Sequence, residues 1–428
     1  MNATPARKPP EDMGLTDFYQ ATKFTIFDAV LEQLDARGLT ASSSPSVLRE
    51  VIETAVHRHS HRENVPLNAA ERIRLADDVQ HEITGLGPLE SLLRDPTIDD
   101  VIVNGPHRVY VERGGQLRRA PVRFRDAGHL MNIIQRIVGP IGRRVDEATP
   151  YVDARLSDGS RVNVVIPPAA LDGPLVSIRK FRAQPLAPAD YVRQGAMSAE
   201  MLDFLGRAVR SRLNMLICGG TGSGKTTLLG MLSSFIGDTE RLITIEDAAE
   251  LQLRQEHVAR METRPPNVDG TREVSARDLM RNALRMRPDR VILGEVRGAE
   301  AVEMLQAMST GHDGSMATMH ANATRDALAR LEMLLGFGGL TGDQKTIRRY
   351  IASSINLLVQ VQRLANGSRR ITQIVELTGL EGDNYILNPL FAFEEHPPLS
   401  GHGEHRTLSL RPFFAARLVK GGPAGAAS

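Results

Sequence analysis

Residues 219–227 read GGTGSGKTT, a glycine-rich stretch between an apolar run and a helical pattern. The apolar run is NMLICGG, and the helical pattern extends from Thr226 to Phe235. A strand, a glycine-rich loop ending in Lys-Thr and a helix, in this order, predict a loop that binds phosphate groups. Such a unit joins a strand of a parallel sheet to a covering helix, so it predicts an α/β fold for this part of the chain.

The residue types in this loop suit phosphate binding. Glycines let the backbone turn its N–H groups toward phosphate oxygens, and Lys225 adds a positive charge. The Thr226 hydroxyl is suited to bind Mg²⁺, and the N-terminus of the following helix directs its dipole at the anion. We expect a bound nucleotide to contact Gly219, Gly220, Thr221, Gly222, Ser223, Gly224, Lys225, Thr226 and Thr227.

The spacing of apolar residues divides the chain into segments. Residues 14–94 have mostly helical spacing, with a capping box at Asn68 and Glu71, and predict a bundle of three helices. Residues 95–181 contain short β-rich runs, turn dipeptides and one helical stretch, which predict an α+β domain. Three prolines in residues 182–190 indicate a linker.

From residue 191 to 420, apolar strands alternate with helices. This alternation indicates a parallel sheet covered by helices. The predicted fold class is therefore α/β, with a P-loop NTPase domain preceded by an α+β domain and an N-terminal helical bundle. We expect disordered tails at residues 1–13 and 421–428, which are polar or small.

Acidic and imidazole side chains end three further strands of this domain. RLITIED ends in Glu246 and Asp247, and DRVILGE ends in Glu295. GSMATMH ends in His320, and the loop before it holds His312. Nucleotide chemistry on a parallel sheet takes place at the carboxyl ends of the strands. Together with the phosphate loop, these strand ends predict a site for phosphoryl transfer.

Composition argues against some classes of function. The chain has 52 basic and 51 acidic residues, a net charge of +1 and no tryptophan. Nucleic-acid-binding domains usually carry an excess of positive charge, so we expect no stable nucleic-acid binding. No apolar run is long enough to form a transmembrane segment, and the first residues lack the apolar centre of a secretory signal. We therefore expect a cytoplasmic protein.

The stretch LRMRPDRVILGEVRG, residues 284–298, resembles the signature of the type II/type IV secretion ATPase superfamily. TIEDAAEL resembles the aspartate box of that family, and TGHDGSMATMHAN resembles its histidine box. Three upstream stretches, GLGPLESLL, VNGPHRVYVERGG and VDARLSDGSRVNVVIPP, resemble the tight-adherence (Flp) pilus branch, the CpaF/TadA-like ATPases. Gly298 replaces the usual aspartate, which is a further similarity to this branch. The resemblance covers roughly residues 85–395 and implies a RecA-like fold for the P-loop NTPase domain.

The resemblance implies a role for each candidate residue. Glu295 would orient or deprotonate the attacking water, and Glu246 is the rival base or a ligand of water bound to Mg²⁺. His320 and His312 would sense the γ-phosphate. Arg297 would fix the loop or join a neighbouring acid, and a plain salt bridge is an equal alternative.

Three arginines of the α+β segment are the last candidates. In the family, positions matching Arg155, Arg161 and Arg179 face the nucleotide from the N-terminal domain. Arginines of a neighbouring element stabilise the negative charge that develops during phosphoryl transfer. The alternative is that these arginines are solvated hairpin charges.

The resemblance implies an ATP- and Mg²⁺-dependent homo-hexameric motor that powers tight-adherence pilus assembly. Its partners would be pilus platform proteins, at the cytoplasmic face of the inner membrane. One alternative is a type IV secretion traffic ATPase that moves protein or DNA substrates. Two others are a RecA-type nucleic-acid motor, against which the charge balance argues, and a nucleotide-dependent switch, against which Glu246 and Glu295 argue.

Overall fold

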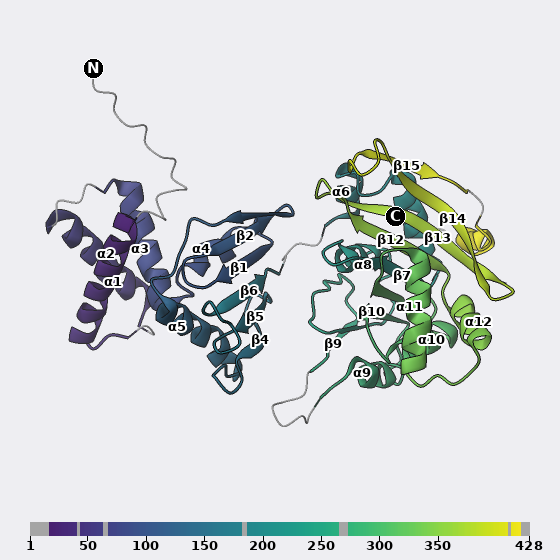
Figure 1. Ribbon diagram of the computed structural model, residues 1–428, viewed down its shortest axis with the longest axis horizontal. Coiled ribbons are helices and arrows are strands. Elements are labelled where there is room, and N and C mark those ends of the chain that lie inside the picture. Colours follow the sequence, from purple (N-terminus) through teal and green to yellow (C-terminus); the bar gives the residue numbers. More distant parts are fainter. Residues whose placement is uncertain are drawn as a thin grey trace, which may run out of the picture. The chain divides into compact units, whose positions relative to one another are not determined.

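The computed structural model describes residues 17–40, 43–62, 67–181, 186–264, 273–409 and 412–420. The expected tails at 1–13 and 421–428 lie outside the described residues. The chain divides into two compact units, Met1–Arg182 and Ala183–Ser428. Figure 1 labels the elements of each unit.

The N-terminal unit begins with a bundle of three helices, α1 (Asp17–Ala36), α2 (Pro45–Arg62) and α3 (Ala69–Thr84). Helix α3 starts at the predicted capping box, where Asn68 and Glu71 each bond the other's backbone N–H. The facing sides of the helices bury an aliphatic core that includes Ile26, Val30, Ile52, Leu75 and Val79.

The α+β part of this unit is a six-stranded antiparallel sheet in the order β3-β2-β1-β6-β5-β4. Its strands are β1 (Asp100–Asn104), β2 (Val109–Arg113), β3 (Gln116–Arg119), β4 (Tyr151–Arg155), β5 (Arg161–Val165) and β6 (Leu175–Arg179). Helix α5 (Ala127–Val138), which runs into the short 3₁₀ helix η2 (Gly139–Ile141), packs its apolar side against the sheet.

Helix α4 (Leu89–Arg94) belongs to the sheet's core rather than to the bundle's. Its side chains Leu89 and Leu92 are buried among the residues of β1, β2 and α5. The boundary expected between the helical bundle and the α+β domain, at residue 94, therefore differs from the boundary between the two cores, which falls after α3. The apolar spacing of α4 predicts a buried face but not the core against which that face packs.

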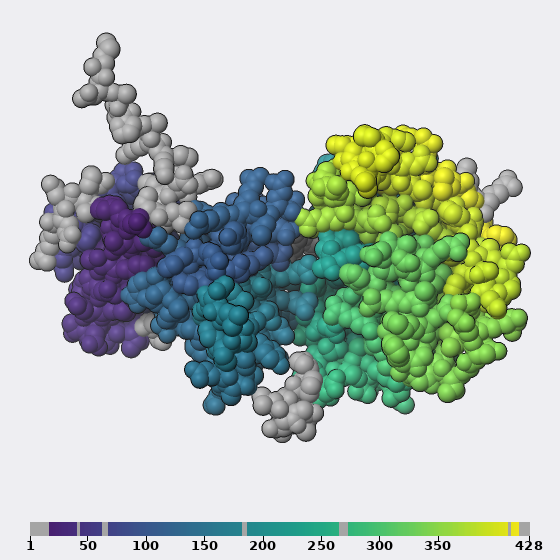
Figure 2. Space-filling model, viewed as in Figure 1, coloured from purple at the N-terminus to yellow at the C-terminus, as the bar shows by residue number. Residues whose placement is uncertain are grey.

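A buried ionic network joins the bundle to the α+β part. Lys23 of α1 donates to Glu82 of α3 at 2.7 Å, and the other oxygen of Glu82 lies 2.8 Å from Nε2 of His129 in α5. Lys23 and Glu82 are each 3% exposed. In Figure 2 the bundle, in purple, and the α+β residues, in blue, form one continuous surface.

The C-terminal unit is built on a nine-stranded sheet in the order β15-β14-β13-β12-β7-β11-β10-β8-β9. The pairs from β12 to β9 are parallel, and those from β12 to β15 are antiparallel. The strands are β7 (Met215–Gly219), β8 (Leu242–Glu246), β9 (Val258–Glu262), β10 (Arg290–Val296), β11 (Met316–His320), β12 (Leu357–Arg363), β13 (Arg369–Glu381), β14 (Asn384–Glu395) and β15 (Gly403–Thr407).

Helices cover both faces of this sheet, as the alternating pattern predicts (Figure 1). On strand β7, Met215 and Ile217 face one core, whereas Leu216 and Cys218 face the other. The first core is closed by α6 (Pro188–Arg193), α7 (Ala199–Arg210), α8 (Lys225–Ser233) and α13 (Ala415–Lys420). The second is closed by α9 (Ala276–Ala283), α10 (Ala301–Ser309), α11 (Thr324–Phe337) and α12 (Gln344–Ser354).

The segment expected to be a linker, 182–190, differs in part from that expectation. Residues 182–185 lie outside the described residues, but Pro188 begins helix α6. Proline is well suited to the first turn of a helix, because the N–H it lacks would have no partner there. Among the described residues, no helix combines the length and apolar character needed to cross a bilayer.

Candidate functional site

The glycine-rich loop connects β7 to α8, as the motif predicts, and its backbone requires the glycines. Gly222 and Gly224 have φ angles of +69° and +96°, which side chains disfavour. A Cβ atom on Gly219 would lie 2.4 Å from the carbonyl oxygen of Val361. The loop therefore has the tight turn and the close backbone packing that only glycines allow at these positions.

Lys225 starts helix α8 and is almost buried, with 8% of its surface exposed. Its Nζ atom donates to the carbonyl oxygen of Gly220 at 3.0 Å, and the Ser223 hydroxyl donates to the same oxygen. Thr226 follows in the first turn of α8 and is half-buried. The two predicted ligands, the lysine for phosphate and the threonine for Mg²⁺, thus stand at the helix N-terminus.

The charged strand ends lie side by side at the edge of the sheet that carries the loop. Strands β7, β11, β10 and β8 are consecutive neighbours and run parallel. His320 pairs with Gly219, and Gly294 follows the pair formed by Leu293 and Ile245. The structure therefore brings His320, Glu295 and Glu246 to the same edge as Lys225.

Strand β10 has an irregularity that changes the direction of the Glu295 side chain. The register shifts between Leu293 and Val296, so that Gly294 and Glu295 together lie opposite one residue of β11, Thr318. The Thr318 hydroxyl donates to the carbonyl oxygen of Gly294 at 2.6 Å. Such a bulge turns a side chain out of the regular alternation. It accounts for a half-buried glutamate at the end of an otherwise buried strand.

Glu246 is held firmly through one oxygen only. Its Oε2 atom accepts the backbone N–H groups of Glu250 and Leu251 at 2.8 and 2.9 Å. Its Oε1 atom is buried and has no hydrogen-bond partner among the described residues. Burial raises the pKa of this carboxyl above its ordinary value. A buried acceptor without a partner is costly, so Oε1 is suited to a ligand that donates or carries positive charge.

Glu295 has the opposite environment. Its Oε2 atom accepts from Arg297 at 2.7 Å, and Arg297 also lies 3.2 Å from Asp247. Burial acts to raise the pKa of Glu295, but Arg297, Lys225 and His320 together hold it below its ordinary value. Glu295 is therefore an ionised carboxylate, partly occupied by Arg297. Arg297 joins two neighbouring acids, as one of the sequence alternatives has it.

His312 does not lie in this cluster. It lies in the loop before β11, whereas His320 ends that strand. A strand rises about 3.3 Å per residue, so the two ends of β11, Met316 and His320, lie about 13 Å apart, and His312 precedes the first of them. The histidine box spans both ends of one strand, and only its second histidine lies at the phosphate-loop edge.

The three arginines of the N-terminal unit form one cross-strand row. Arg155 of β4 pairs with Arg161 of β5, and Arg161 pairs with Arg179 of β6. Directly paired residues point to the same face of a sheet. Within the row, the Nε atom of Arg155 donates to the carbonyl oxygen of Gly159 at 3.1 Å. Arg179 has a loose contact with Asp100 at 4.0 Å.

The residues present fit a nucleotide bound with Mg²⁺. The loop offers backbone N–H groups and Lys225 to phosphates. The Thr226 hydroxyl and the Oε1 atom of Glu246 offer the oxygen ligands that Mg²⁺ and its bound water prefer. This fit rests on the loop geometry and on the buried Oε1 atom of Glu246, which has no hydrogen-bond partner among the residues that the structure describes.

Sequence reasoning missed two arginines beside the loop, Arg363 and Arg369. They end β12 and begin β13, and Arg369 donates to the carbonyl oxygen of Gly222 at 2.9 Å. The signal was a further apolar strand, LLVQVQR, which ends in Arg363 and is followed by a turn and Arg369. Its carboxyl end belongs to the same edge, because β12 runs parallel to β7.

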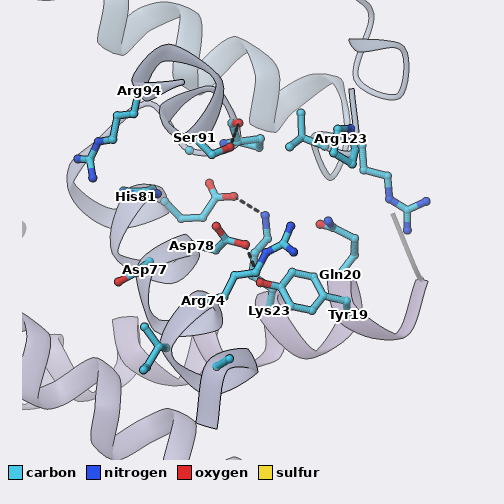
Figure 3. A pocket seen from close by; sticks show the side chains of 17 residues that line it. Tyr19, Gln20, Lys23, Arg74, Asp77, Asp78, His81, Ser91, Arg94 and Arg123 are labelled. Atoms are coloured by element: carbon cyan, nitrogen blue, oxygen red, sulfur yellow. Dashed lines mark hydrogen bonds and ion pairs between the residues drawn. The ribbon is translucent and has the colours of Figure 1, made fainter. Parts of the chain in front are cut away.

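A separate cavity of about 580 Å³ lies in the N-terminal unit, between α1, α3 and α4 (Figure 3). Its acids already have partners: Asp78 accepts from Tyr19, Glu82 from Lys23 and Asp77 from Arg49. It contains none of the predicted site residues. We therefore place the chemistry at the phosphate loop and not in this cavity.

The chain is similar to known proteins over most of its length. The family model described as "Type II/IV secretion system protein" matches residues 82–378. A Mycobacterium tuberculosis protein named for conjugal transfer is 40% identical over 310 residues, covering 71% of this chain and 88% of that protein. Conjugal transfer protein TrbB of Rhizobium radiobacter is 32% identical over 308 residues, covering 71% and 91%.

A solved structure, that of the Yersinia pseudotuberculosis ATPase DotB, resembles this chain in fold. The TM-score is 0.51 at 18% sequence identity, covering 70% of this chain and 79% of that one. The family match begins inside α3, so α1, α2 and most of α3 lie outside it. The matched part contains the α+β sheet and the whole edge that carries the candidate site.

Proposed function

Because the chain belongs to the family of type II/IV secretion system proteins and is an ATPase, we propose that it is a motor that couples ATP hydrolysis to movement in a secretion or pilus machine. The observation that carries the proposal is the single edge at which four parallel strands deliver the phosphate loop, His320, Glu295 and Glu246. Positioned charge of this kind is the main contribution of a protein to phosphoryl transfer.

The loop and Lys225 bind the phosphate groups in this proposal. Lys225 exchanges its contact with the Gly220 carbonyl for phosphate oxygens, and the backbone N–H groups and the dipole of α8 add to its charge. Bound Mg²⁺ would neutralise part of the phosphate charge. Thr226 and, through water, the Oε1 atom of Glu246 would hold it.

Glu295 orients the attacking water and accepts its proton in this proposal. Its contact with Arg297 must then loosen, because the guanidinium occupies one oxygen of the carboxylate and stabilises its ionised form. Glu246 is the rival base, because its pKa is raised and its Oε1 atom has no hydrogen-bond partner within the described part of the chain. His320 reports the presence of the γ-phosphate from the neighbouring strand.

The arginine row of β4, β5 and β6 supports a second part of the proposal. We propose that Arg155, Arg161 and, from the next strand, Arg179 bind the phosphate chain from the N-terminal unit when the protein closes on ATP. The support is that the three arginines lie on one face of the sheet across adjacent strands, and that arginines of a neighbouring element stabilise the charge that develops during phosphoryl transfer. Alanine in place of Arg155 or Arg161 should reduce turnover without preventing ring assembly.

Two machines remain candidates for the work that the motor does. The stretches that resemble the tight-adherence branch favour assembly of a pilus, with platform proteins as partners at the cytoplasmic face of the inner membrane. The names of the relatives favour the second candidate, a type IV secretion ATPase that moves protein or DNA substrates. In both, we propose a homo-hexamer.

The activity is tested with purified protein and three variants. K225A should lose ATP hydrolysis because it lacks the charge directed at the phosphates, and turnover at the wild-type rate would exclude the loop as the site. E295Q should bind ATP but not hydrolyse it, since the amide keeps the shape of the carboxylate without its basicity. Normal turnover in E295Q together with loss in E246Q would instead make Glu246 the base.

The choice between the two machines is tested in cells. A strain with K225A in place of the wild-type protein should lose surface pili and keep conjugal transfer if the protein powers pilus assembly. Loss of transfer with normal piliation would establish the second candidate. A strain with R370M, a substitution outside the proposed phosphate contacts, serves as the control for expression and folding.

A further inference from the structure

The hairpin of β12 and β13 brings two arginines to the phosphate loop. Val361 of β12 pairs with Gly219, so the next residues of β12 extend past the start of the loop. Arg363 and Arg369 pair with each other where β13 begins. A Cβ atom on Gly222 would lie 3.9 Å from Nη1 of Arg363. Both side chains thus come from strands that supply neither the phosphate loop nor Glu246 or Glu295.

Arg369 makes the closer contact. Its Nε atom donates to the carbonyl oxygen of Gly222 at 2.9 Å, and its Cδ atom would lie 3.3 Å from a Cβ atom on Gly224. The side chain therefore lies along the outside of the loop between two glycines with positive φ angles. Within the part of the chain that the structure describes, Arg369 forms no ion pair with a carboxylate, so its charge is not neutralised.

The contact fixes the direction of a backbone N–H group. In a trans peptide, the carbonyl of one residue and the N–H of the next point in opposite directions. Because Arg369 holds the Gly222 carbonyl outward, the N–H of Ser223 points inward. There it meets only a long contact of 3.4 Å with the Gly220 carbonyl, which a phosphate oxygen would replace. Inward N–H groups are the groups with which such loops hold phosphates.

We propose that Arg369 is a positioning residue for nucleotide binding: it holds the peptide between Gly222 and Ser223 in the orientation that binds phosphate, and adds its charge to the loop. This inference rests on the proposed function, since it concerns the same site. The N–H of Ser223 meets the same phosphate before and during hydrolysis, so the contact strengthens binding uniformly. Its loss raises KM and leaves kcat largely unchanged.

Three variants test the proposal in the full-length protein. R369M keeps an apolar stem beside Gly224 but has no donor and no charge, whereas R369K keeps the stem, the donor and the charge. R370M is the matched control, because Arg370 is the adjacent arginine and donates to the carbonyls of Gln194 and Arg369 rather than to the loop. The measurements are the Kd for ADP with Mg²⁺, KM and kcat for ATP, and the thermal unfolding of each variant.

We expect R369M to raise the Kd for ADP and the KM for ATP about tenfold, the effect of one hydrogen bond from a charged donor. R369K should stay within about threefold of wild type, and R370M should match wild type. The proposal is overturned if R369M binds ADP as R370M does, or if R369K loses as much affinity as R369M. A fall in kcat without a change in KM would equally contradict it.

The outcomes separate this inference from the proposed function. Failure of the proposed function appears as wild-type protein that does not hydrolyse ATP or a K225A variant that still does. Failure of the inference alone appears as an active wild type whose R369M variant has normal Kd and KM. If R369M does not fold, R369Q replaces it, because its side chain ends before the Gly222 carbonyl and carries no charge.

Discussion

Replacing Gly294 by alanine tests how closely β10 and β8, the strands that carry Glu295 and Glu246, pack against each other. An added Cβ atom would stand 2.9 Å from the Cγ atom of Glu246, whereas carbon atoms in contact prefer about 3.5–4.0 Å. Glu246 has little freedom to move aside, because its carboxylate accepts two backbone N–H groups. The added methyl group must therefore displace either the carboxylate or strand β10.

We expect G294A to lower the free energy of unfolding by about 1–3 kcal/mol, the usual cost of an extra methyl group in a packed site. We expect kcat to fall by at least about tenfold, since a shift of about 1 Å at a reacting group has a large effect on rate. The affinity for ADP should change by less than about threefold, because binding energy comes mainly from the phosphate loop.

Urea unfolding, ATP turnover and ADP titration measure the three quantities. The matched control is G336A in α11, where an added Cβ atom meets nothing within 4 Å. Alanine is favoured over glycine in a helix, so G336A should be at least as stable as wild type and fully active. Equal stability and equal kcat in the two variants would refute the reasoning.

Three further predictions concern charge. Burial raises the pKa of Glu246 above its ordinary value of 4.5. As the pH rises from 4.5 through the raised pKa of the folded protein, ionisation of Glu246 therefore lowers the free energy of unfolding. E246Q should therefore unfold at higher urea concentration than wild type near neutral pH but not at acidic pH, and a constant difference would contradict this. R297M removes a cation that lowers the pKa of Glu295. In the pH dependence of kcat/KM, the rise on the acidic side should then move to higher pH. If this rise stays at the same pH, the result would argue against Glu295 as the base. K23M leaves Glu82 without one partner of a buried pair and should cost about 3–5 kcal/mol in urea unfolding; a cost below about 1 kcal/mol would show that His129 alone satisfies Glu82.

The features that the sequence predicts best are those encoded locally. The phosphate loop is a continuous stretch whose glycines, lysine and flanking elements all belong to one strand–loop–helix unit. The alignment of Glu246, Glu295 and His320 could also be predicted, because the carboxyl ends of parallel strands meet at one edge. For each of these residues, knowing the end of its own strand was sufficient.

Other features depend on contacts between distant segments. Arg369 reaches a carbonyl 147 residues earlier in the chain, through a strand order that no local pattern contains. The bulge at Gly294 and Glu295 appears only when β10 is paired with β11. Helix α4 has the same apolar spacing whichever core it joins, and the histidine box does not indicate that its two histidines lie at opposite ends of β11.

The central claim is that the edge of the sheet that carries the loop is the site of ATP hydrolysis. A crystal structure of the full-length protein with Mg²⁺ and a non-hydrolysable ATP analogue tests it most directly. The account predicts phosphate oxygens within hydrogen-bond distance of Lys225 Nζ and the Ser223 N–H, with the Oε1 atom of Glu246 contacting the metal or its water. A nucleotide bound elsewhere, or phosphates in the loop with Glu246 and Glu295 both remote from them, would contradict it.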